Sequence, residues 1–79
     1  MAAVEVILPK VDMDMESGTI AKWLVEEGQR VREGDILFEM ETGKSVMEVE
    51  APASGIIRNL APVDGRELPV GTQVAFIDP

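Results

Sequence analysis

The sequence repeats itself when it is shifted by 37 residues. At this offset six of the seven glycines pair with one another, and several apolar positions also coincide. The aligned positions include Ser17-Gly18 with Ser54-Gly55, Gly28 with Gly65, Gly34 with Gly71, Trp23 with Leu60, Val31 with Leu68, Leu37 with Val74 and Met40 with Ile77. One half alone would expose an apolar face, which two packed halves would cover. The repeat therefore predicts one domain, 1–79, built from two similar halves (about 1–41 and 42–79) around a pseudo-two-fold axis.

The segments between the glycines have the composition of β-strands. Val and Ile supply 16 of the 79 residues, and β-branched side chains favour pleated backbone. Gly- and Pro-containing turn signals separate short runs. The expected strands are Val4–Leu8, Gly18–Leu24, Arg30–Val31, Ile36–Thr42, Ser45–Glu50, Gly55–Leu60, Glu67–Leu68 and Gln73–Asp78. This spacing predicts an all-β fold, a small sandwich or barrel, with Trp23 and the methionines in its core.

The glycine that the repeat leaves unpaired, Gly43, precedes Lys44 between two segments of alternating polarity. Folded as a hairpin with a two-residue loop, these segments keep their apolar side chains on one face. Glycine at the first loop position permits the positive φ of a type II′ turn at Gly43. The expected cross-strand pairs are Phe38 with Val49, Met40 with Met47 and, on the other face, Glu39 with Glu48.

Lys44 would stand at the tip of this hairpin among several carboxylates. Lysine amines are mostly protonated at neutral pH and are weak nucleophiles without activation. A tight turn nevertheless presents the amine in a fixed place. The pattern therefore indicates a site of covalent modification rather than a catalytic amine.

Composition excludes most other chemistry. Cysteine and histidine are absent, so we expect no disulfide, no thiolate or imidazole metal site and no Cys- or His-dependent catalysis. The formal net charge of −8 disfavours binding to nucleic acid or to an anionic membrane. No apolar run approaches the roughly 20 residues that span a bilayer, and the first residues resemble no signal or transit peptide. A cytoplasmic, non-enzymatic domain is expected.

Residues 39–52, Glu-Met-Glu-Thr-Gly-Lys-Ser-Val-Met-Glu-Val-Glu-Ala-Pro, resemble the lipoyl-attachment motif of dihydrolipoamide acyltransferases (E2). These are components of 2-oxo acid and acetoin dehydrogenase complexes. The similarity extends over the whole chain, through Leu8-Pro9, Ser17–Ile20, Trp23–Gly28, Val31, Gly34-Asp35 and Ser54-Gly55. It implies a flattened barrel of two four-stranded antiparallel sheets, standing as the N-terminal domain of a longer E2 chain.

The resemblance also implies a carrier function. Lys44 would be amide-linked to lipoate by a lipoate ligase or lipoyl transferase, with Thr42, Gly43, Ser45, Met40 and Met47 forming the turn and its flanks. The partners would be the thiamine-diphosphate-dependent E1, the E2 acyltransferase core and dihydrolipoamide dehydrogenase (E3). Gly43 departs from the family, in which Asp commonly precedes the lysine.

Acidic residues near the lysine are candidates for partner recognition. In the family the loop equivalent to residues 11–17 lies near the lipoyl turn and helps E1 recognise the domain. The candidates here are Asp12, Asp14, Glu16, Glu41 and Glu48. The alternative is a loop whose charges are merely solvated.

Two other functions remain open. A biotinyl carrier domain has the same general fold and a lysine at the same hairpin, but that lysine usually sits between two methionines. Gly43 and Ser45 flank Lys44 here. The second alternative is an unmodified β-barrel interaction module in which Lys44 is an ordinary surface residue.

Overall fold

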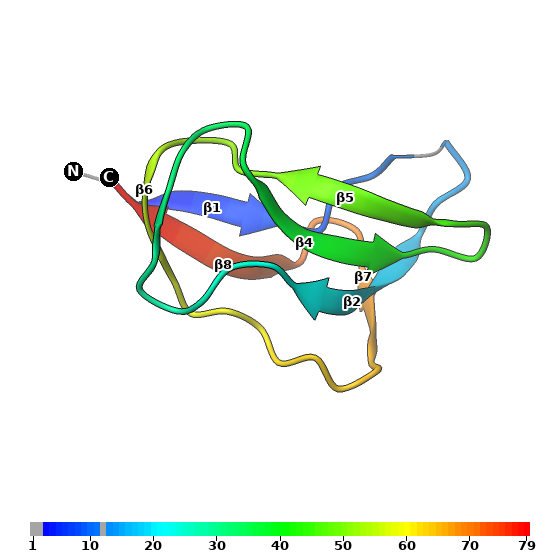
Figure 1. The fold of residues 1–79 in the computed structure, drawn as a ribbon. Helices are drawn as coiled ribbons and strands as arrows, with labels where there is room; N and C mark the ends of the chain where they lie inside the picture. Colours follow the sequence, from blue (N-terminus) through cyan, green and yellow to red (C-terminus); the bar gives the residue numbers. More distant parts are fainter. Residues whose placement is uncertain (1–2, 12) are drawn as a thin grey trace.

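The computed structural model describes residues 3–11 and 13–79, in which every regular element is a β-strand. The all-β prediction is confirmed (Figure 1). The strands are β1 (Val4–Ile7), β2 (Ser17–Trp23), β3 (Arg30–Val31), β4 (Ile36–Glu41), β5 (Val46–Glu50), β6 (Gly55–Arg58), β7 (Glu67–Pro69) and β8 (Gln73–Asp78). Within these described residues, no helix is long and apolar enough to cross a membrane.

The strands form two four-stranded antiparallel sheets, in the orders β1-β8-β6-β3 and β5-β4-β2-β7. Each sheet takes two strands from each half of the chain. The sheets pack face to face in a flattened body of 34 × 23 × 17 Å. Among the described residues, fifteen buried apolar side chains make up the core: Val6, Leu8, Met15, Ile20, Val25, Val31, Leu37, Phe38, Met40, Val49, Ala51, Ile57, Val74, Ala75 and Ile77.

The pseudo-two-fold axis predicted from the repeat is confirmed by the strand register. Ile20 pairs with Met40 between β2 and β4, and residues 57 and 77, each 37 positions later, pair between β6 and β8. The axis also exchanges the two sheets strand for strand. Gly28 and Gly65, which the repeat aligns, have similar positive φ angles of 85° and 76°.

The symmetry fails at one connection. Val6 pairs with Ala75, and Val49 pairs with Phe38. Since Phe38 and Ala75 are 37 residues apart, Val6 corresponds to Val49 at an offset of 43. The additional six residues lie between Val6 and Ser17, chiefly in the loop that joins β1 to β2, which is longer than its counterpart between β5 and β6. This loop packs beside the β4–β5 turn.

Strand ends match the expected bounds to within two residues, and those of β3 and β8 coincide with them. The largest difference is at β6, which was expected to reach Leu60 but ends at Arg58. Asn59 adopts a left-handed φ of 57°, and the Glu27 carboxylate accepts hydrogen bonds from the amides of Asn59 and Leu60 at 2.9 and 3.2 Å. A side chain from the β2–β3 connection therefore replaces the strand ladder here.

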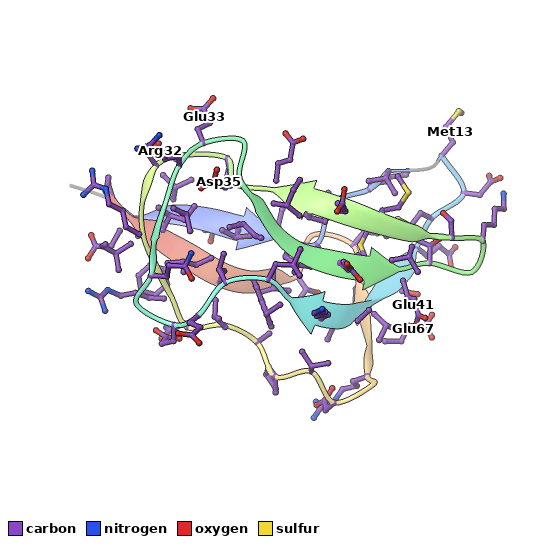
Figure 2. All side chains as sticks on the ribbon, viewed as in Figure 1. Met13, Arg32, Glu33, Asp35, Glu41 and Glu67 are labelled. Atoms are coloured by element: carbon purple, nitrogen blue, oxygen red, sulfur yellow. The ribbon has the colours of Figure 1, made fainter. Side chains whose placement is uncertain are left out.

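The expectation that Trp23 and the methionines lie in the core is only partly correct. Met15 and Met40 are buried, and Trp23 packs against the core with its ring centroid 4.8 Å from that of Phe38. Met13, however, is 90% exposed because it lies on the long β1–β2 loop, outside both sheets (Figure 2). Met47 is also exposed, near the end of the edge strand β5. Met1 lies outside the described residues.

Candidate functional site

The site is built on the β4–β5 hairpin, whose predicted register is confirmed. Phe38 pairs with Val49, Glu39 with Glu48 and Met40 with Met47. Phe38, Val49 and Met40 are buried and fix the hairpin to the core. The hairpin extends to one end of the molecule, whereas β1 begins and β8 ends at the other (Figure 1). The register thus holds residues 42–45 at the tip of a two-stranded ribbon whose base is packed on the core.

The conformation of the turn differs from the prediction. Among the described residues, positive φ angles occur at Asn59 and at Gly28, Gly34, Gly55, Gly65 and Gly71, and Gly43 is not among them. The type II′ turn that glycine would permit at this position is therefore not formed. A Cβ atom on Gly43 would meet no atom within 4 Å, so neither backbone nor space requires glycine there.

Hydrogen bonds from Thr42 close the turn instead. The Thr42 amide donates to the Ser45 carbonyl at 2.8 Å, and the Thr42 hydroxyl donates to the same oxygen at 3.1 Å. The hydroxyl oxygen also accepts from the amides of Lys44 and Ser45, at 3.2 Å each. A short polar side chain commonly organises a turn in this way. Its effect is to fix the backbone that carries Lys44.

Lys44 is exposed at the tip of the turn and borders a groove of about 290 Å³. One wall comes from the end of the β1–β2 loop and the start of β2, the other from the turn, and β7 contributes one residue. The lining residues are Asp14, Met15, Glu16, Ser17, Thr42, Gly43, Lys44 and Glu67. The described part of the groove combines one cationic side chain with three carboxylates.

Of the predicted recognition residues, Asp14, Glu16 and Glu41 lie at this end of the molecule, and Asp12 lies outside the described residues. Asp14 and Glu16 line the groove. Glu41 shares an outer sheet face with Glu67, because both pair with Thr19 from opposite sides, and Figure 2 shows both residues at this end of the molecule. Glu48 lies opposite Glu39 on β5. The structure thus places Asp14, Glu16 and Glu41 around the lysine turn.

Sequence reasoning missed three lining residues, Met15, Ser17 and Glu67. Ser17 donates a hydrogen bond to the Glu67 carboxylate, which ties β7 to the start of β2. The two residues are 50 positions apart, and their contact depends on the pairing of β2 with β7. No local motif predicts that pairing. The repeat shows only that β7 is the counterpart of β3.

Comparison with known proteins assigns the fold to a family. The biotin/lipoyl family model, described as "biotin-requiring enzyme", matches residues 4–77. The chain belongs to the biotin/lipoyl domain family. Its similarity to lipoyl domains and to components of 2-oxo acid dehydrogenase complexes is pronounced.

Three relatives illustrate this. This chain is 45% identical over 76 residues, 95% of its length, to the dihydrolipoyllysine-residue acetyltransferase component of the pyruvate dehydrogenase complex of Zymomonas mobilis. It is 43% identical over 94% of its length to the pyruvate dehydrogenase E1 component subunit beta of Rhizobium meliloti. The solution structure of the lipoyl domain of the 2-oxoglutarate dehydrogenase complex of Azotobacter vinelandii superimposes with a TM-score of 0.75 and 26% identity, covering 96% of both chains.

The domain spans only a small part of its longer relatives. It covers 17% of the Zymomonas acetyltransferase component and 16% of the Rhizobium E1 subunit. The similarity is therefore confined to one domain, which occurs in relatives with different names, an acetyltransferase component and an E1 subunit.

Proposed function

We propose that this domain is a lipoyl carrier and that Lys44 is its attachment site. The observation that carries the proposal is the position of Lys44, exposed at the tip of a hairpin whose register and buried flank hold it clear of the core. The kinship with dihydrolipoyllysine acyltransferase components and with a lipoyl domain supports lipoate as the attached group.

The residues present fit such an attachment. The amine of an exposed lysine can form an amide, and the open space around Gly43 leaves access for a modifying enzyme. The chain contains no cysteine, so any redox-active sulfur has to be brought by an attached group. Lipoate would supply a dithiolane able to take up an acyl group and two electrons. Amide formation removes the charge of Lys44 and changes the formal net charge from −8 to −9.

The chain's own residues would position and present the attached arm. The hairpin keeps the attachment point at the end opposite to the start of β1 and the end of β8 (Figure 1). A tethered carrier raises the effective concentration of its group at successive enzymes. We propose as partners a lipoate ligase or lipoyl transferase, a thiamine-diphosphate-dependent E1, an E2 acyltransferase core and the E3 dehydrogenase, all in the cytoplasm.

The acidic residues around the turn are proposed to be part of the recognition surface for E1. Asp14 and Glu16 line the groove beside Lys44, and Glu41 lies on the adjoining sheet face. Complementary charge accelerates productive encounters between proteins. A basic surface on the partner would match this end of the domain.

The proposed parent is an E2 acyltransferase of a 2-oxo acid or acetoin dehydrogenase complex. The similarity to the Zymomonas acetyltransferase component favours this parent. The similarity to an E1 beta subunit favours, as a second candidate, a carrier domain attached to E1. Sequencing the full gene distinguishes the two, because an acyltransferase or a thiamine-dependent domain would accompany the carrier.

Intact-mass measurement tests the attached group. The domain is incubated in parallel with lipoate and a lipoate ligase, and with biotin and a biotin ligase. We expect a single lipoyl adduct that is lost in Lys44→Arg and retained in the control Lys22→Arg, a lysine on β2. A biotin adduct on Lys44 would support the biotinyl alternative, and no adduct under either condition would support the unmodified interaction module. Either result would overturn the proposal.

A further inference from the structure

We propose that Thr42 is the positioning residue that presents Lys44 to the modifying enzyme; this inference rests on the proposed function. The turn contains two residues, Gly43 and Lys44, and neither has a positive φ. The turn is therefore not held by the conformational freedom of glycine. Its shape has to come from another source, and the hydrogen bonds identify Thr42.

The hydroxyl of Thr42 uses its full hydrogen-bonding capacity within the turn. A hydroxyl has one donor and two acceptor positions. Here the donor goes to the Ser45 carbonyl at 3.1 Å, and the two acceptor positions take the amides of Lys44 and Ser45 at 3.2 Å. One side chain thus contacts the backbone of Lys44 and of the residue that follows it. The conformation of the lysine backbone is coupled to this single oxygen.

The position of Thr42 makes this coupling effective. Thr42 is half-buried, directly after β4, while Gly43, Lys44 and Ser45 are exposed. A β-branched side chain has few accessible χ1 rotamers, so the hydroxyl is held in place by its own chain. Thr42 also lines the groove beside Lys44. Removing the hydroxyl would loosen the turn, which forms the wall of the groove that carries Lys44 and that a ligase has to approach.

The consequence concerns enzyme-dependent acylation rather than the reactivity of the amine. An enzyme acting on a protein lysine requires that amine at a defined place, and small displacements of a reacting group reduce rates strongly. A small soluble acylating reagent imposes no such requirement. Loss of the Thr42 hydroxyl should therefore slow the ligase and leave simple chemical acylation unchanged.

The test compares Thr42→Val, Thr42→Ala and Thr42→Ser as substrates of a lipoate ligase. For the two variants without a hydroxyl we expect kcat/KM to fall about tenfold, equivalent to about 1.4 kcal/mol, together with faster hydrogen exchange at the amides of residues 44 and 45. Thr42→Ser should restore both values. The matched control is Thr72→Val, which removes a turn hydroxyl bonded to the Pro69 carbonyl and should be modified like the wild type.

Two further measurements separate presentation from folding and from reactivity. Circular dichroism should show that both hydroxyl-less variants keep the native fold, and acetylation of Lys44 by an N-hydroxysuccinimide ester should proceed at the wild-type rate. Three results would overturn the inference: wild-type ligase kinetics in Thr42→Val, slow ligase kinetics in Thr42→Ser, or loss of the fold in either hydroxyl-less variant. In each case lipoylation of the wild type would still support the carrier function. If the wild type takes up no lipoate, the proposed function itself is overturned.

Discussion

A Cβ atom on Gly55 would lie 2.5 Å from the carbonyl oxygen of Asp78. Gly55 begins β6, where the neighbouring residue Ile56 pairs with Asp78 of β8, and Gly55 itself pairs with Val31 of β3. Backbone thus crosses closely over this position, and backbone cannot move aside as a flexible side chain can. The glycine is required by packing between strands.

Gly55→Ala should destabilise the domain by about 3 kcal/mol or more, since overpacking and an unfavourable φ of 155° act together. Gly18, its repeat partner, is crowded only by flexible methionine side chains, at 3.1 to 3.2 Å, so Gly18→Ala should cost about 1 kcal/mol. Urea unfolding monitored by the fluorescence of Trp23 measures both. The matched control is Gly43→Ala, expected within about 0.5 kcal/mol of the wild type. Equal losses at all three glycines would contradict this account.

The Glu27 carboxylate should contribute measurably to stability because it accepts two backbone amides, those of Asn59 and Leu60. Glu27→Ala leaves both donors without this acceptor and should lower the free energy of unfolding by about 1–2 kcal/mol. Denaturant titration provides the value. The control is the adjacent Glu26→Ala, also exposed, for which we expect a change of no more than about 0.5 kcal/mol. Similar effects at both positions would argue against a specific role for Glu27.

Trp23 should stabilise the domain through both its ring and its indole N–H. The ring packs against Phe38, and Nε1–H donates to the Ala61 carbonyl at 2.8 Å. Trp23→Phe retains an aromatic ring but loses the donor and should cost about 1 kcal/mol, whereas Trp23→Ala should cost about 3 kcal/mol. Since these variants lack the fluorophore, circular dichroism is the appropriate probe. A loss in Trp23→Phe as large as in Trp23→Ala would assign the whole effect to the hydrogen bond.

Charges near the lysine should influence the encounter with the proposed partner E1. Glu16→Gln and Glu41→Gln, made on the lipoylated domain, should each lower kcat/KM for reductive acylation about two- to fivefold at low ionic strength, because rim charges act mainly on association. The control is Glu33→Gln, at the opposite end of the molecule (Figure 2). The difference should shrink as salt screens the charges. If Glu33→Gln has the same effect, net charge rather than local recognition is responsible.

The sequence predicted the fold well because its signals are local or repeated. Cross-strand polarity fixed the register of Met40 with Met47, and the 37-residue offset anticipated the symmetry of the two sheets. The first signal is the alternation of side chains along a strand, and the second is the similarity between two segments of the chain. Both can be recognised in the sequence alone.

The predicted backbone conformation differed from the structure where a side chain forms hydrogen bonds with the backbone. At Gly43 the presence of glycine suggested a positive φ, but the hydroxyl of Thr42 organises a turn that does not need it. At Asn59 the Glu27 carboxylate ends a strand that composition alone would continue. Glu67 lies in the groove because β7 pairs with β2, which is distant in the sequence. These contacts are decided by three-dimensional proximity.

The interleaving of the two halves in both sheets has a consequence for the order of folding. The β4–β5 hairpin joins neighbouring segments and can form early. Within the described sheets, however, β1 pairs only with β8, at the other end of the chain. The groove beside Lys44 also includes Glu67 of β7. Contacts between distant segments form slowly. During synthesis the lysine therefore emerges long before its surroundings are complete. An enzyme that reads the groove as well as the turn would act only on a chain that has finished folding.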